Sequence, residues 1–69
     1  MQTMAPLSQT LRRERRRAGL TQEELAEAAG VGINTIRRIE QGEIEEPRVS
    51  TLRKLADALG IRVRDLLED

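Results

Sequence analysis

The chain has 69 residues, which is enough for one small domain. It contains no Cys, His, Phe, Tyr or Trp, and this composition excludes disulfides, zinc sites, histidine acid–base catalysis and aromatic stacking on single-stranded nucleic acid. Twelve basic and twelve acidic residues give a formal net charge of zero, and no apolar run approaches the ~20 residues of a membrane span.

Charge is segregated along the chain although the total is neutral. Residues 1–20 hold five Arg against one Glu, residues 21–30 hold three Glu and no basic residue, and residues 43–48 hold three Glu against one Arg. The domain therefore has a basic end and an acidic loop, which the net charge does not report. The absence of Cys fits a reducing compartment and no signal-peptide pattern is visible, so we expect a cytoplasmic protein.

The first helix is predicted over residues 7–18. Residues 1–6 show no periodicity and are expected to be flexible, although Pro6 suits a first helical turn. Gly19 is expected to end the helix in the left-handed conformation. The apolar content of this helix is thin, and arginines dominate its surface.

Two further helices, joined by a very short turn, are predicted over residues 22–29 and 33–41. The sequence TQEE at residues 21–24 has the pattern of a capping box, in which the Thr hydroxyl and the Glu carboxylate each satisfy a free backbone N–H. The turn at residues 30–32 is Gly-Val-Gly. Because it is so short, it holds the helices at a steep angle, which predicts a helix-turn-helix over residues 22–41.

A linker that contains Pro47 precedes a fourth helix, predicted over residues 49–59 from apolar residues at i, i+3, i+4 and i+7. A short last helix is predicted over residues 63–67. The fold class is therefore all-α, a compact bundle of five short helices. The predicted core consists of Leu11, Leu20, Leu25, Ala26, Val31, Ile36, Ile39, Leu52, Leu55, Ala56, Leu59 and Leu66.

The chain resembles the XRE family of helix-turn-helix domains, the phage repressor and Cro type, over about residues 11–67. The resemblance is carried by Arg15 with Gly19-Leu20-Thr21-Gln22, by Leu25-Ala26, Gly30-Val31, Thr35-Ile36, Ile39-Glu40 and Gly42, and by Pro47, Leu52 and Leu59-Gly60-Ile61. It implies a lambda-repressor-like DNA-binding domain over residues 7–69. It also implies a sequence-specific transcriptional regulator that binds double-stranded DNA as a homodimer on a (pseudo)palindromic operator, without a cofactor or a metal.

Helical rotation separates an outward face of the third helix. Asn34 and Arg38 point away from the core, Arg37 lies on the flank of that face, and Ile33 lies further round. By the resemblance, the base-reading positions are Ile33, Asn34 and Arg38, and the positions at the DNA phosphates or backbone are Gln22, Gly32, Arg37 and Arg48. The plainer alternatives are solvated helix surface for Asn34, Arg37 and Arg38, a partner interface for Ile33 and a polar first-turn role for Gln22.

The resemblance also implies a largely buried ion pair between Arg15 and Glu40, which would orient the reading helix. The alternative is two separate exposed charges. Four further arginines of the first helix are expected to be solvated and to attract DNA at long range: Arg12, Arg13, Arg16 and Arg17.

Some positions depart from the family pattern. Gly32, Arg48 and Arg62 lack a good capping side chain, so the helices that follow them are expected to be poorly capped. The linker at residues 43–46 is acidic although that loop lies near the DNA backbone in relatives, so it either repels DNA or faces a protein partner. Leu66, Leu67 and Ile44 are the expected apolar dimer surface.

One other functional class stays open, a protein-binding helix-turn-helix module such as an antitoxin or coactivator domain, which the acidic linker and the neutral charge favour. An enzyme is not expected, because the chain lacks His and Cys, has only two Ser and is too small for a useful pocket. A sensor domain after Asp69 stays open as well.

Overall fold

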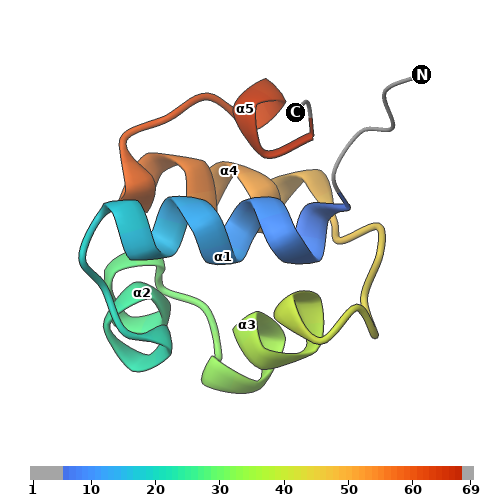
Figure 1. Ribbon diagram of the computed structural model, residues 1–69, viewed down its shortest axis with the longest axis horizontal. Helices are drawn as coiled ribbons and strands as arrows, with labels where there is room; N and C mark the ends of the chain where they lie inside the picture. The colour runs from blue at the N-terminus through green and yellow to red at the C-terminus, as the bar shows by residue number, and fades with distance from the viewer. Residues whose placement is uncertain (1–5, 68–69) are drawn as a thin grey trace.

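The computed structural model describes residues 6–67, which form five helices (Figure 1). Their bounds are α1 Leu7–Arg17, α2 Gln22–Ala29, α3 Ile33–Glu40, α4 Val49–Leu59 and α5 Val63–Leu67. No strand occurs within this range. Each bound lies within one residue of the predicted bound, which confirms the all-α, five-helix fold.

The ends of the chain add one correction. The expected flexible segment 1–6 lies outside the described residues except for Pro6. That residue is the N-cap of α1 and has an extended backbone, with φ −64° and ψ 154°, so it precedes the first turn rather than lying in it.

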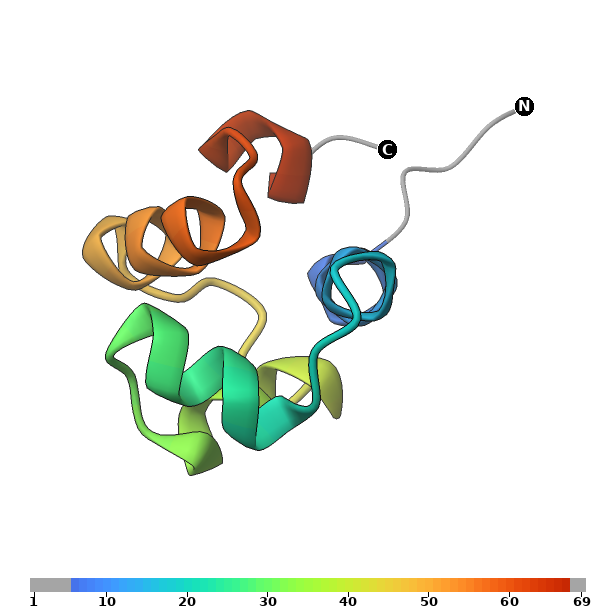
Figure 2. The same cartoon turned by 90° about the vertical axis from the view of Figure 1, so that its left-hand side faces the viewer.

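The helices lie on two sides of α1. Figure 1 shows α4 and α5 above and behind α1, and α2 and α3 below it. The view along α1 in Figure 2 shows that α4 stands apart from α1 across the core. Helix α1 packs against α3 and α5, whereas α4 packs against α2 and α5. Helix α4 therefore supports α2, and α1 supports α3.

The core is aliphatic and lies between these helices. Its buried members are Leu11, Leu25, Ala26, Ala29, Ile36, Ile39, Leu52, Leu55, Ala56 and Leu66. Burial of each Leu or Ile contributes about 1.5–3 kcal/mol. Leu20, Val31 and Leu59 were predicted to be core residues but are only partly buried, because they lie in turns or in the last turn of a helix and cover the edge of the core.

Both ends of α2 have the predicted cap residues. The capping box is complete: the backbone N–H of Glu24 donates to Thr21 Oγ1 at 3.0 Å, and the backbone N–H of Thr21 donates to Glu24 Oε1 at 2.9 Å. Helix α2 ends at Gly30, whose φ of 70° is in the left-handed region where a Cβ is disfavoured. The chain then turns within two residues into α3, and the two helices pack against each other.

The predicted weakness of the other helix starts is confirmed in two cases and wrong in the third. Neither Gly32 before α3 nor Arg48 before α4 makes a side-chain cap hydrogen bond. Before α5, however, the backbone N–H of Arg62 donates to Asp65 Oδ2 at 2.9 Å. An acidic residue three positions on thus supplies half of a capping box even where the N-cap side chain does not.

Candidate nucleic-acid interface

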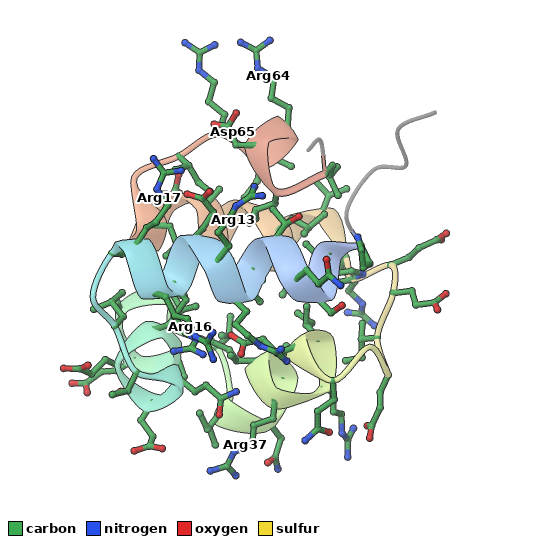
Figure 3. The ribbon with its side chains drawn as sticks, viewed as in Figure 1. Arg13, Arg16, Arg17, Arg37, Arg64 and Asp65 are labelled. Carbon is green, nitrogen blue, oxygen red and sulfur yellow. The ribbon has the colours of Figure 1, made fainter. Side chains whose placement is uncertain are left out.

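Helix α3 has a buried face and an exposed face. Ile36 and Ile39 are both 0% exposed and anchor the helix to the core. Asn34, Arg37 and Arg38 are exposed, as helical rotation predicts. In Figure 3, Arg37 points away from α1 at the lower edge of the molecule. The outward face of α3 therefore presents one amide and two guanidinium groups to solvent.

The remaining sequence-predicted site residues lie around this face. Ile33 is half-buried at the start of α3 and packs against the core. Gly32 is the exposed N-cap of α3, and a Cβ there would meet only Thr35 Oγ1, at 3.9 Å. Arg48 is exposed and is the N-cap of α4. It follows the acidic linker and is not part of α3.

A buried carboxylate lies behind the exposed face. Glu40, at the end of α3, is 3% exposed. Arg15 of α1 binds it with two parallel hydrogen bonds, Nε to Oε2 at 2.7 Å and Nη2 to Oε1 at 3.1 Å. Arg15 also donates from Nη1 to the carbonyl of Leu20 at 2.8 Å. The structure thus brings together the two residues of the expected ion pair, in the bidentate geometry that carboxylate–guanidinium pairs favour.

Gln22 joins this cluster, which sequence reasoning did not foresee. Its Nε2 donates to Glu40 Oε1 at 3.1 Å. Because a carboxylate accepts and cannot donate, this contact fixes which end of the Gln22 amide faces Glu40. Glu40 therefore links the start of α2 to the end of α3.

The protonation of Glu40 follows from its surroundings. Burial alone would raise the pKa of the Glu40 carboxyl, but the hydrogen bonds from Arg15 and Gln22 and the positive charges of Arg15 and Arg12 outweigh burial and hold the pKa below its usual value. The same pair raises the pKa of Arg15. Glu40 is thus charged throughout the neutral range and keeps its partners in place.

Arg12 was expected to be solvated, and this expectation is wrong. Its Nη2 donates to the backbone carbonyl of Glu40 at 2.8 Å, and its Nε lies 3.6 Å from Glu40 Oε1. The side chain is 42% exposed, so it spans the surface and the cluster. The signal that could have found it is its spacing from Arg15, since residues three apart share one helix face.

The other arginines of α1 are surface groups. Arg17 is 73% exposed and lies 3.3 Å from Glu14, and Arg13 lies 3.4 Å from the same carboxylate. Exposed pairs of this kind contribute only about 0–1 kcal/mol. Figure 3 shows Arg13 and Arg17 on the α5 side of α1, whereas Arg16 lies on the side of α2.

The acidic linker and the expected dimer surface are placed as follows. Glu43, Glu45 and Glu46 are exposed. Within residues 6–67, only Glu43 of these three approaches a cation, with 3.9 Å between its Oε2 and Arg38 Nε. Leu66 is 0% exposed, so its assignment to a dimer surface is wrong: the short helix α5 turns it into the core. The large apolar side chains that are exposed among the described residues are Val49, at 60%, and Leu67, at 48%.

Two kinds of feature are absent from residues 6–67. No group of three or more acidic residues there is arranged to hold a metal ion. None of the five helices has both the length and the apolarity needed to cross a bilayer.

A five-helix domain with an α2–α3 turn of this kind is a helix-turn-helix domain. The chain belongs to the helix-turn-helix family, because the model of that family matches residues 11–66. The similar proteins described next are named as regulators or repressors, which are not classes of enzyme.

Two curated relatives illustrate the relationship. An uncharacterized HTH-type transcriptional regulator of Bacillus subtilis (strain 168), RghRB, is 38% identical over 64 residues, covering 93% of this chain and 46% of the relative. The cryptic phage CTXphi transcriptional repressor RstR of Vibrio cholerae is 40% identical over 50 residues, covering 72% of this chain and 44% of the relative. The chain thus spans less than half the length of these curated relatives.

A solved structure is similar over nearly its whole length. The crystal structure of SinR, the Bacillus subtilis master regulator for biofilm formation, in complex with DNA superposes with a TM-score of 0.87 and 31% identity. The match covers 90% of this chain and 98% of that one.

Proposed function

We propose that this chain is the sequence-specific DNA-binding domain of a transcriptional regulator, and that it reads double-stranded DNA with α3 in the major groove. The observation that carries the proposal is the division of α3 into a fully buried aliphatic face and an exposed face with an amide and two guanidinium groups. The names of the relatives, a transcriptional regulator and a transcriptional repressor, and the DNA complex of SinR support the same role.

Base reading falls to three residues in this proposal. The Asn34 amide can pair with adenine N6 and N7, and the Arg38 guanidinium can pair with guanine O6 and N7. Ile33, half-buried at the start of α3, offers an apolar contact for a thymine methyl group. Each good bidentate pair contributes about 1–3 kcal/mol of discrimination against the wrong base.

The DNA backbone is held by groups around α3. Gln22 lies in the first turn of α2, where free N–H groups and the helix dipole favour a phosphate. Its amide has two N–H bonds, so one can donate to Glu40 while the other donates to a phosphate oxygen. Gly32 offers its backbone at the start of α3, Arg37 a charge on the flank, and Arg48 a charge for the backbone near the minor groove.

The assembly that we propose is a homodimer. One eight-residue reading helix touches few base pairs, and two-fold pairing repeats those contacts on a (pseudo)palindromic operator. The exposed Leu67 and Val49 and the half-buried Ile44 are the apolar side chains offered to the partner.

We assign residues 7–69 to the DNA-binding domain, with its helix-turn-helix at residues 22–41. We place the protein in the cytoplasm, with its DNA.

Selection of bound sequences from a random DNA library tests this proposal, combined with the mass of the purified complex from light scattering. We expect an enriched, two-fold symmetric sequence with half-sites about 10 base pairs apart, and two chains per duplex.

A single half-site with one chain bound would contradict the dimer. Failure to retain any DNA at low salt would contradict DNA binding and favour a protein-binding module, with the exposed linker at residues 43–46 as its contact surface.

A further inference from the structure

The C-terminal end of α3 is closed by local bonds and one bond from another helix. The last four carbonyls of an α-helix have no partner within it. The carbonyls of residues 37–39 accept hydrogen bonds from the backbone directly after α3, at 2.8–3.2 Å. The fourth carbonyl, that of Glu40, accepts from Arg12 Nη2 at 2.8 Å, and Arg12 is 28 residues away on α1.

This difference in origin matters for the orientation of α3. The local bonds move with the helix and so do not fix it relative to the rest of the domain. Arg12 does, because it holds the main chain of Glu40 while Arg15 holds the side chain of the same residue. At the other end of α3, Gly32 makes no side-chain cap bond. The guanidinium charge at a helix C-terminus is also favoured by the helix dipole.

We propose that Arg12 is a positioning residue that determines the sequence specificity of α3. It acts by clamping the end of the helix to α1, so that Asn34 and Arg38 meet base edges in one geometry, and it does not itself contact DNA. This inference rests on the proposed function of α3.

A positioning role has a signature that a phosphate contact lacks. Base recognition depends on the direction of each hydrogen bond, whereas phosphate contacts are independent of sequence. Loosening α3 therefore weakens binding to the preferred site more than binding to random DNA. It leaves the slope of log K against log[salt] unchanged, because no phosphate loses its cation.

The test compares Arg12→Gln with Arg16→Gln, which removes the same charge one turn further along α1 from an exposed side chain. Dissociation constants are measured on the selected operator and on random-sequence DNA across a range of salt. We expect Arg12→Gln to lower the ratio of specific to random affinity roughly tenfold, which corresponds to the lower end of the range for one hydrogen bond with a charged partner. Arg16→Gln should leave the ratio unchanged, and Arg12→Lys, which keeps a donor for the carbonyl, should restore part of it.

Two results would overturn the inference. An equal loss on both DNAs with a shallower salt slope would make Arg12 a phosphate contact. An unchanged ratio would show that the clamp does not affect reading. Thermal unfolding of each variant, followed to check that it is folded at the assay temperature, keeps a loss of structure apart from a loss of specificity.

A measurement without DNA separates this inference from the proposed function. Amide hydrogen exchange at residues 38–42 should be roughly tenfold faster in Arg12→Gln and unchanged in Arg16→Gln, since only the first loses the clamp. Unchanged exchange in both would overturn the clamp even if the wild type binds DNA. Faster exchange in a protein that binds no DNA would retain the clamp and refute both the proposed function and the specificity role.

Discussion

The arginines of α1 fall into two groups that differ in surroundings and not in chemistry. Five of the six residues from 12 to 17 are arginine. Arg12 and Arg15 bind the buried Glu40 of α3, whereas Arg17 is 73% exposed and pairs only locally, with Glu14. Residues three apart share a helix face, which places Arg12 beside Arg15, and the packing of α3 against α1 brings Glu40 to both. A run of basic residues is therefore not a uniform DNA-attracting surface; part of this one belongs to the fold.

Alanine substitutions in the two groups should differ strongly in their effect on the free energy of unfolding. Arg15→Ala leaves Glu40 charged and buried without its bidentate partner, which costs about 3 kcal/mol, the lower end of the range for a buried pair. Arg17→Ala should stay within about ±0.5 kcal/mol, as for other exposed positions. Urea unfolding measures both, with Arg12→Ala expected between them. Equal free energies of unfolding for Arg15→Ala and Arg17→Ala would erase the distinction.

Acid unfolding tests the first group of arginines through their partner, the Glu40 carboxylate. Since the folded protein holds the pKa of Glu40 below its usual value, the charged group adds stability above pH of about 4.3, and this is lost as the pH falls through the lowered pKa. Glu40→Gln lacks this titration. We expect the stability advantage of the wild type over Glu40→Gln to shrink on acidification, because the other carboxyls titrate in both proteins. Parallel pH profiles of the free energy of unfolding would contradict the assignment.

Neutralising the acidic linker should change DNA affinity only modestly. The linker carries exposed negative charges, as the surface of α1 carries exposed positive ones. If the linker lies near the DNA backbone, Glu45→Gln with Glu46→Gln should raise affinity for random DNA by a larger factor than affinity for the operator, and should steepen the salt dependence. The effect is modest because exposed charges are screened over ~10 Å at 0.1 M salt. Binding assays at two salt concentrations measure it. Unchanged binding to both DNAs at low salt would mean that the linker does not face the duplex.

Local features of the sequence were enough to predict most of the fold. Glycines after four of the helices and the capping box at Thr21 mark the helix ends, and the 3.6-residue period marks the buried faces. Features that depend on tertiary packing were not predictable in this way. The bond from Arg12 to the Glu40 carbonyl requires the crossing of α1 and α3, and the burial of Leu66 depends on the packing of α5 against α1 and α4.

In the candidate site, too, the features set by local sequence were predictable and those set by tertiary packing were not. The exposed face of α3 follows from helical rotation, so the positions of Asn34 and Arg38 could be predicted from the sequence. The link between Gln22 and Glu40 joins residues 18 apart on two helices, and neither period nor spacing indicates it. Sequence patterns thus predict which groups face outward, whereas the structure is needed to see what holds them.

Base reading by the outward face of α3 can be tested with Arg38→Ala, and Arg37→Ala on the flank of the same face is the matched control. Dissociation constants are measured on the selected operator and on variants with each base pair changed. Arg38→Ala should lose about 1–3 kcal/mol on the operator and lose the preference at one base pair, whereas Arg37→Ala should weaken all sequences about equally. If Arg38→Ala instead weakens every sequence equally and keeps the preference at each position, Arg38 does not read a base and the account of α3 is wrong.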